Sequence, residues 1–443
     1  MVHFLQSSRL LENPLRSLVV LFIVWKTLLI LLACCSPGPG YDTSTLLLPP
    51  WKPSHGNLEH PTGLSQAVSY VSSKLTRWDA IYFVQASKRG YVFEQEWAFG
   101  WGFTRLIKLI ANGIVLLGIP RYDTLEVVVA IFIAHLSHLV STLLLFKLTI
   151  AIFPARNVRF GLVAAVLHIL SPAGLFLSAP YAESSCAMLS FAGSLLFVQS
   201  STAGRPASVG HDALILLSGI AFGIATTFRS NGILNGLLLL EEASKIIWNL
   251  QYSFNFASIR RLVFTGMGGL FVASGFILPQ YIAYTEYCLE SNVSSTRPWC
   301  GNVLPSIYTF VQDYYWNVGP FRYWTTSNIP LFLIAAPMFA FLVKSSIWTF
   351  TSTQSLVFKE TNSSMSPTLR NMAISQLLLA LLTLTTAHVQ IISRISSSFP
   401  VWVWYGVSLV EKKDGGLGSV AVRYMVMYAI IQGGLFASFL PPA

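Results

Sequence analysis

The chain has 443 residues, of which 53% are hydrophobic and only 10% are charged, and its mean hydropathy is +0.60. Since soluble globular proteins carry about 25% charged residues, this composition excludes an ordinary soluble enzyme, a disordered chain and a nucleic-acid-binding module. The formal net charge of +10 fits basic loops that orient membrane helices better than it fits binding of a polyanion. Composition therefore indicates a polytopic membrane protein.

Apolar segments of the length that a membrane helix needs, about 20 residues, occur along nearly the whole sequence. The weakest is 400–411, which is too short to span alone, and 101–118 carries Arg105 and Lys108 and is expected to lie in the membrane interface. The predicted fold class is all-α, a single membrane domain over residues 1–443. We expect about eleven membrane helices, at residues 17–36, 124–150, 158–177, 184–200, 212–228, 233–249, 262–283, 328–343, 371–391, 400–411 and 421–440.

The first span is expected to be a retained helix, because its apolar run is longer than that of a cleaved signal peptide. Lys26 lies inside this span. A lysine at such a position is expected to pair with a phosphate or a carboxylate, or to extend its side chain to the membrane interface. Lys and Arg are concentrated in the short loops of one side, which predicts a cytoplasmic N-terminus. Residues 37–123 (the first loop) and 285–327 (the second loop) are then expected on the opposite, lumenal side.

The second loop contains two cysteines and a glycosylation sequon. Cys288 and Cys300 are predicted to form a disulfide, because such bonds persist in an oxidising lumen. Asn292 lies between them and is predicted to carry a glycan. A second sequon, at Asn362, falls in a predicted cytoplasmic loop and is expected to stay unmodified.

The first loop contains an amphipathic pattern followed by aromatic and acidic residues. Apolar residues recur at three- and four-residue spacing between 68 and 82, which predicts a helix lying on the membrane surface. Asp79 in this helix has two open interpretations, an ion pair with Arg77 or Lys74 and a functional carboxylate. The residues that follow combine rings with carboxylates, which is typical of sugar-binding sites. They are Tyr91, Glu94, Glu96, Trp97 and Phe99.

Five motifs are spread between Arg77 and Arg394. They are RWDAIYF (77–83), RGYVFEQEWAF (89–99), SPAGLFLSAPYAES (171–184), RSNG (229–232) and HVQIISR (388–394). Their residues, order and spacing together resemble those of the GPI mannosyltransferase 2 (PIG-V) family. The sequence departs from that family at Gly100-Trp101-Gly102, where many relatives have a Phe-Pro type turn.

This resemblance implies a mannosyltransferase of the endoplasmic reticulum membrane with the polytopic GT-C fold. Members of the family use dolichyl-phosphate mannose as donor and add the second mannose, in α1,6 linkage, to a glycosylphosphatidylinositol (GPI) precursor. The expected partners are these membrane lipid substrates and, as a further candidate, a small accessory membrane subunit, but no nucleic acid. The donor already has a good leaving group and no metal-ligand cluster is visible, so we expect neither a metal nor another cofactor.

A β-linked donor and an α-linked product require one inverting displacement, in which a base removes the proton of the acceptor hydroxyl. Asp79 is the candidate base, and Glu94 is the alternative base or a sugar ligand. Arg229 and Arg394 are predicted near lumenal helix ends, where cations would stabilise the leaving phosphate. Both also fit the role of anchors at the membrane interface. Glu183 also fits a carboxylate that is stabilised by the dipole at a helix start. The candidate substrate-binding residues are Arg77, Trp78, Tyr91, Glu94, Glu183, Arg229, Asn231, His388, Gln390 and Arg394.

Two other functions stay open on the sequence. One is a transferase of the same fold that acts on a different acceptor, a protein or a dolichol-linked glycan. The other is a transporter, a scramblase or a noncatalytic assembly subunit. Transporters usually contain inverted repeats with helices broken at the midplane, and the sequence shows no such halves.

Overall fold

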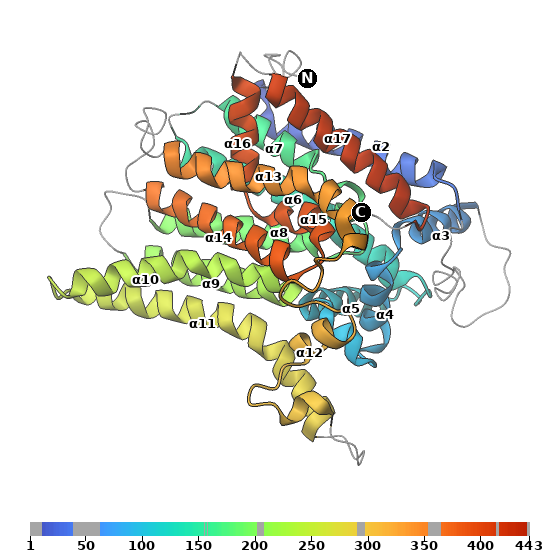
Figure 1. Ribbon diagram of the computed structural model, residues 1–443, viewed down its shortest axis with the longest axis horizontal. Coiled ribbons are helices and arrows are strands. Elements are labelled where there is room, and N and C mark those ends of the chain that lie inside the picture. Colours follow the sequence, from blue (N-terminus) through green and yellow to red (C-terminus); the bar gives the residue numbers. More distant parts are fainter. Residues whose placement is uncertain are drawn as a thin grey trace.

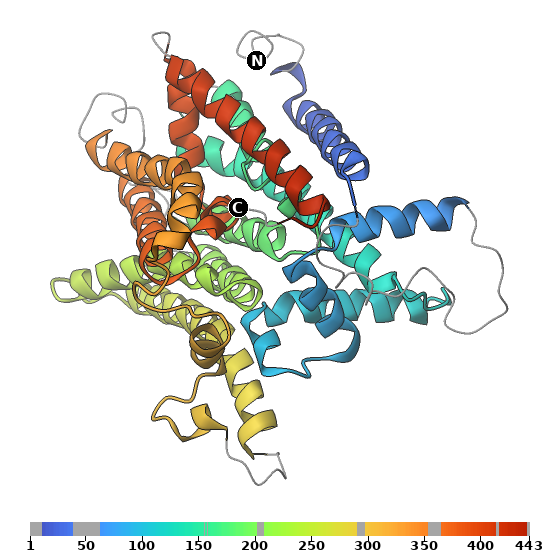
Figure 2. The same ribbon diagram turned by 45° about the vertical axis from the view of Figure 1, so that its right-hand side comes forward.

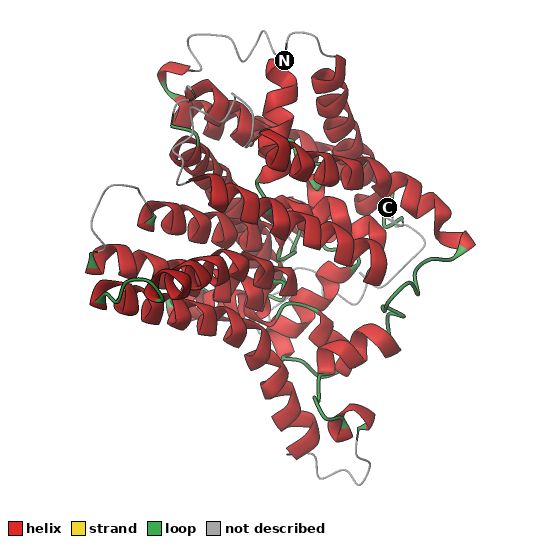
Figure 3. Ribbon diagram, turned by 60° about the vertical axis from the view of Figure 1, so that its left-hand side comes forward, coloured by secondary structure: helices red, strands yellow, loops and turns green. Residues whose placement is uncertain are grey.

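The structure is a computed structural model, and it describes residues 11–38, 63–154, 156, 158–201, 208–289, 297–352, 365–412 and 416–440. Within these ranges every element is a helix and none is a β-strand (Figure 3). The predicted all-α class is therefore confirmed.

Seven helices among the described residues are long and apolar enough to cross a membrane, so the chain is a membrane protein. They are α2 (Pro14–Cys35), α6 (Leu125–Ile152), α9 (Val209–Phe228), α11 (Phe256–Tyr284), α13 (Ile329–Ser352), α14 (Met365–Thr386) and α17 (Gly416–Ala437). The other predicted spans also contain helices, but these helices are too short or not apolar enough to count as membrane spans. These are α7 (Val158–Ile169), α8 (Glu183–Ser200), α10 (Gly236–Leu250) and α16 (Val401–Glu411). The predicted number of about eleven spans is thus not confirmed.

The predicted span 158–177 is wrong in its extent. Helix α7 ends at Ile169, and residues 170–182 form a turn that contains the short 3₁₀ helix η4 (Gly174–Leu177). Pro172 explains this end, because proline has no N–H to donate and disfavours helical backbone at the residue before it. The turn is almost wholly buried and leads directly into α8.

Helices α9 and α11 run side by side along one edge of the bundle (Figure 1). A Cβ atom on Gly219 would lie 2.3 Å from the Cα of Gly268, and one on Gly275 would lie 2.2 Å from the carbonyl oxygen of Gly223. Such small residues allow the backbones of two membrane helices to approach closely. The contact fixes α11 beside the end of α9.

Within its described residues, the first loop forms four short helices (Figure 2). They are α3 (Gly63–Leu75), α4 (Asp79–Arg89), η3 (Glu94–Ala98) and α5 (Trp101–Leu116). Helix α3 packs against α2, whereas η3 packs against α12 (Ile307–Tyr314). The single helix predicted over 68–82 is wrong, because the chain breaks at residues 76–78. Trp78 there has a φ of 54°, a left-handed conformation that is uncommon for a bulky residue.

Tertiary contacts hold this break in place. The Tyr181 hydroxyl donates a hydrogen bond to the Arg77 carbonyl at 3.4 Å. The Arg77 guanidinium lies 5.0 Å from the ring of Phe439, and the Trp78 ring meets the same ring edge-on at 5.0 Å. The predicted substrate-binding residues Arg77 and Trp78 therefore contact the C-terminal part of the chain, and Asp79 becomes the first residue of α4.

The second loop packs against the first. It contains η6 (Thr285–Leu289), η7 (Pro298–Gly301) and α12 (Ile307–Tyr314). A disulfide joins Cys288 to Cys300, and the buried Trp299 belongs to a hydrophobic cluster that includes Trp97 of η3. The predicted glycosylation site Asn292 and the sequon at Asn362 lie outside the described residues.

Candidate functional site

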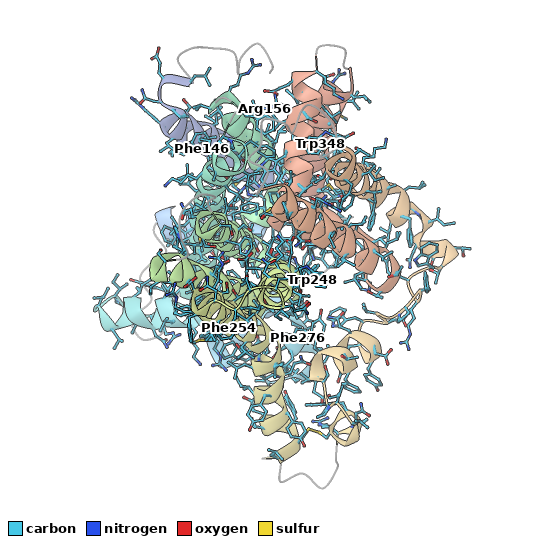
Figure 4. The ribbon with its side chains drawn as sticks, turned by 90° about the vertical axis from the view of Figure 1, so that its left-hand side faces the viewer. Phe146, Arg156, Trp248, Phe254, Phe276 and Trp348 are labelled. Atoms are coloured by element: carbon cyan, nitrogen blue, oxygen red, sulfur yellow. A yellow bond between two sulfur atoms is a disulfide. The ribbon has the colours of Figure 1, made fainter. Side chains whose placement is uncertain are left out.

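A cavity of about 490 Å³ opens between the first loop, the second loop, α11 and the ends of α9 and α14; we call it the site cavity. Sites for small ligands typically measure about 300–1,000 Å³. Figure 4 marks Phe276, which lies on the part of α11 that borders this cavity. Three of the predicted site residues line it, namely Asp79, Arg229 and His388.

Asp79 lines the site cavity from the N-terminus of α4, where the helix dipole stabilises a negative charge. Its side chain is 35% exposed, so a ligand can reach the carboxylate. The Nη2 and Nη1 atoms of Arg394 donate to Asp79 Oδ2 at 3.4 and 3.5 Å. The ion-pair partner of Asp79 is therefore Arg394, and not Arg77 or Lys74 as the local spacing suggested.

Four charged residues from distant parts of the sequence form one ion-pair network: Asp79, Glu183, Arg229 and Arg394. Arg394, in the short helix α15 (Ile392–Ile395), places its Nε 3.5 Å from Glu183 Oε1. Arg229 follows the end of α9 and donates from Nη1 to the same oxygen at 2.7 Å. The Glu183 side chain is fully buried, and a buried charge needs paired partners. Two carboxylates and two guanidinium groups leave the network formally neutral.

Arg394 is held between carboxylates and aromatic rings. Burial by itself would lower the pKa of Arg394, but the carboxylates of Glu183 and Asp79 outweigh it and raise the pKa above its usual value. The guanidinium also lies 4.8 Å from the ring of Phe176 and 5.2 Å from that of Tyr181, which is the geometry of a cation–π contact. Arg394 therefore remains a fixed cation next to Asp79.

The turn before α8 is held by a lysine of the first membrane helix. Lys26 Nζ donates to the Leu177 carbonyl at 3.1 Å and to Ser178 Oγ at 2.7 Å. The hydroxyl of Ser184 donates to the same Leu177 carbonyl at 3.1 Å. Among the described residues, Lys26 thus pairs with no carboxylate, and its buried side chain anchors the turn that leads to Glu183.

Two glycines let the first loop reach the end of α9. A Cβ atom on Gly100 would lie 1.7 Å from the carbonyl oxygen of Phe228, and one on Gly102 would lie 2.1 Å from Thr227 Oγ1. These positions are the ones at which the sequence departs from the Phe-Pro type turn. Their small size allows the contact that places Arg229 at the cavity.

The motif HVQIISR does not continue a membrane helix. The predicted span 371–391 ends at Thr386, the end of α14, and the chain then turns. His388 lines the cavity and its Nε2 donates to the Trp316 carbonyl at 3.1 Å. Burial lowers the pKa of His388, which favours the neutral imidazole.

Gln390 and Asn231 lie near the cavity without lining it. Gln390 Oε1 accepts a hydrogen bond from the Tyr323 hydroxyl at 3.0 Å, and Asn231 Nδ2 donates to Ser398 Oγ at 3.4 Å. Both side chains therefore connect neighbouring segments of the bundle.

Tyr91 and Glu94 belong to the contact between the two loops. The Tyr91 hydroxyl donates to the Phe99 carbonyl at 3.0 Å. Glu94 accepts hydrogen bonds from Trp299 Nε1 at 3.0 Å and from the Tyr315 hydroxyl at 3.3 Å. Neither residue lines the site cavity, whereas Asp79 does.

No sequence pattern singled out Phe176 or Tyr181, whose rings contact Arg394, although both lie in the motif SPAGLFLSAPYAES. The side chains that the second loop contributes to the site cavity were also not predicted, because α12 carries no charged motif. Within the described ranges, His, Cys, Asp and Glu side chains do not gather in threes as metal ligands do.

Comparison with known proteins agrees with the family resemblance. A family model described as Mannosyltransferase (PIG-V) matches residues 15–443. The chain is 43% identical to a protein of Gibberella zeae named GPI mannosyltransferase 2, over 98% of each chain. It is 40% identical to the protein of that name from Aspergillus oryzae, over 98% of this chain and 96% of that one.

Among solved structures, the chain is similar to the Archaeoglobus fulgidus oligosaccharyltransferase tethered to an acceptor peptide. That match has a TM-score of 0.48 and 12% identity, and it covers 99% of this chain and 56% of that one. The family assignment rests on the sequence matches, which extend over nearly the full length. The chain therefore belongs to the mannosyltransferase (PIG-V) family and is a membrane-bound glycosyltransferase.

Proposed function

We propose that this protein transfers the second mannose, in α1,6 linkage, from dolichyl-phosphate mannose to the one-mannose GPI precursor. The observation that carries the proposal is the position of Asp79, whose carboxylate lines the site cavity and is held by Arg394. The name of the relatives at 40–43% identity supports GPI-anchor synthesis as the pathway.

The geometry supports a single inverting displacement. Asp79 takes the proton of the acceptor hydroxyl as that oxygen forms a bond to the anomeric carbon of the donor mannose. The bond from this carbon to the phosphate oxygen breaks, and dolichyl phosphate leaves with the bonding electrons. The proton stays on Asp79 and is later lost to solvent, so the carboxylate is restored.

The leaving phosphate needs cations or hydrogen-bond donors as its charge develops. Arg229 lines the cavity and its side chain is 20% exposed, so an anion in the cavity can reach it. The Arg394 side chain is more deeply buried than that of Arg229, and it acts by holding the Asp79 carboxylate in position. His388, also on the cavity wall, shapes the space between these groups.

We also place the reaction on the lumenal side of the endoplasmic reticulum membrane, with the N-terminus in the cytoplasm. The concentration of Lys and Arg in the loops on one side supports this orientation. The disulfide between Cys288 and Cys300 fits an oxidising compartment for the second loop.

The test is Asp79→Asn in the purified full-length protein, assayed with dolichyl-phosphate mannose and the one-mannose precursor. Transfer should fall by roughly 10²-fold or more, the usual contribution of a general base. Asp313→Asn is the matched control, because Asp313 is an exposed carboxylate of α12 that pairs with Arg322 and does not line the cavity. Normal transfer by well-folded Asp79→Asn protein would reject the catalytic role.

The acceptor is tested separately, because another GT-C transferase would share this chemistry. Cells that depend on Asp79→Asn should accumulate a GPI precursor with one mannose, which lipid analysis detects. Accumulation of a different lipid, or of an unglycosylated protein acceptor with normal GPI precursors, would point to the other acceptor class.

A further inference from the structure

The residues that line the site cavity differ in chemistry. Asp79 and Arg229 of the ion-pair network are charged. The lining side chains of α11, α12 and the segment after α12 that can form directed contacts are polar but uncharged, or aromatic. We call this set the α11–α12 wall: Phe276, Gln280, Tyr308, Thr309, Gln312 and Trp316.

Internal hydrogen bonds organise this wall. The Ser306 hydroxyl donates to Gln280 Oε1, and Gln280 Nε2 donates to the Phe276 carbonyl at 3.2 Å. The hydroxyls of Tyr308 and Ser230 lie 3.0 Å apart, which joins α12 to the segment after α9. The wall is therefore preformed, and a ligand would pay little to order it.

The wall is also fixed relative to the reactive carboxylate. The carbonyl of Trp316 accepts the hydrogen bond from His388. Its indole ring lies 6.4 Å from the ring of Tyr82 and 6.1 Å from that of Phe99, both edge-on. Tyr82 belongs to α4, the helix that begins with Asp79, so α4 and the wall are in direct contact.

Gln312 is the group in the wall that is available for a ligand. It is half-buried, it lines the cavity, and none of the described residues forms a hydrogen bond with its side-chain amide. An amide offers two donors and an acceptor, which suits a hydroxyl group that both donates and accepts. An anion would find no cation among the wall residues, whereas the cation Arg229 belongs to the ion-pair network and directly precedes Ser230, whose hydroxyl lies 3.0 Å from that of Tyr308.

We infer that the α11–α12 wall binds the neutral sugar of the acceptor and presents one of its hydroxyls to Asp79. Gln312 and Tyr308 bind sugar hydroxyls, while the rings of Phe276 and Trp316 lie against C–H faces. The donor phosphate then lies at Arg229, next to this wall, while the acceptor sugar lies against the wall itself. This inference rests on the proposed function, because it assigns one of that reaction's two substrates to a wall.

The experiment measures KM for each substrate with the purified full-length protein, using dolichyl-phosphate mannose and the one-mannose precursor. Gln312→Ala and Tyr308→Phe should each raise the acceptor KM about 3- to 10-fold, the effect of losing one hydrogen bond. The donor KM should stay within about twofold of the wild-type value. Tyr314→Phe is the matched control, since Tyr314 lies on the same helix, is 71% exposed and does not line the cavity.

Several results would overturn the assignment. A rise in the donor KM with an unchanged acceptor KM would place the donor on this wall, and unchanged values for both substrates would show that the wall binds neither. If Gln312→Ala protein is poorly folded, Gln312→Glu keeps the side-chain volume and should still raise the acceptor KM through loss of the amide donors. Wild-type protein that transfers no mannose between these lipids would instead reject the proposed function itself.

Discussion

Glu183 is the residue on which the ion-pair network depends, because its carboxylate is shared by Arg229 and Arg394. Glu183→Gln keeps the volume and removes the charge. Breaking a buried pair from one side typically costs about 3–5 kcal/mol, so the free energy of unfolding should fall by about that amount. Transfer should also fall, since both arginines lose the group that positions them. Thermal unfolding of the purified protein in detergent measures the first effect and a mannose-transfer assay measures the second.

Asp313→Asn gives the comparison for a carboxylate outside the network. Its pair with Arg322 is exposed, with side chains 51% and 47% accessible. Exposed pairs contribute about 0–1 kcal/mol, so this variant should unfold close to the wild-type temperature. Equal unfolding temperatures for Glu183→Gln and Asp313→Asn would show that the network does not stabilise the fold.

His388 should make stability depend on pH. Burial lowers the pKa of His388 in the folded protein, whereas an unfolded histidine titrates near pKa 6.5. Below about pH 6.5 the unfolded chain therefore binds a proton that the folded chain does not, and stability falls as the pH falls. When the pH is lowered from 7.5 to 5.5, the unfolding temperature of the His388→Gln protein should fall less than that of the wild type. Identical pH slopes for the two proteins, from thermal unfolding at each pH, would contradict this account.

At the scale of elements, the contact of α5 with the end of α9 sets the position of Arg229. Gly100→Ala would place a methyl group 1.7 Å from the Phe228 carbonyl oxygen, so one of the two segments must shift. Overpacking of this kind costs about 1–3 kcal/mol, and transfer should fall because Arg229 follows Phe228 directly. Unfolding temperature and transfer rate are the measurements.

Gly113→Ala is the control in the same helix. A Cβ atom on Gly113 would meet no atom within 4 Å, and alanine has a higher helix propensity than glycine by about 1 kcal/mol. This variant should be as stable as wild type or slightly more stable, with normal transfer. A loss of activity in Gly113→Ala equal to that in Gly100→Ala would show that the effect is not specific to the contact with α9.

For the whole molecule, the distribution of Lys and Arg predicts which loops face the lumen. Asn292 in the second loop should carry a glycan, and Asn362 should not. Glycosidase treatment of the expressed protein should increase its gel mobility, and Asn292→Gln should abolish that change. A change that survives Asn292→Gln and disappears in Asn362→Gln would reverse the orientation.

The membrane class follows from composition alone, because a chain with 10% charged residues cannot cover its surface with water-compatible groups. The approximate places of the helices follow from apolar runs, which are local features of the sequence. The five motifs also indicated the family without any structure. Helix ends were less well determined, as at Ile169 and Thr386, where helices end before the apolar run does.

Only the tertiary structure decided which charged groups meet. Local spacing offered Arg77 or Lys74 as the partner of Asp79, but the structure pairs Asp79 with Arg394, 315 residues away. It also breaks the predicted helix at residues 76–78, through contacts with Phe439 and the turn before α8 that no local pattern encodes. The physical reason is that hydrophobic periodicity depends on neighbours in the chain, whereas the position of a buried charge depends on which helices pack around it.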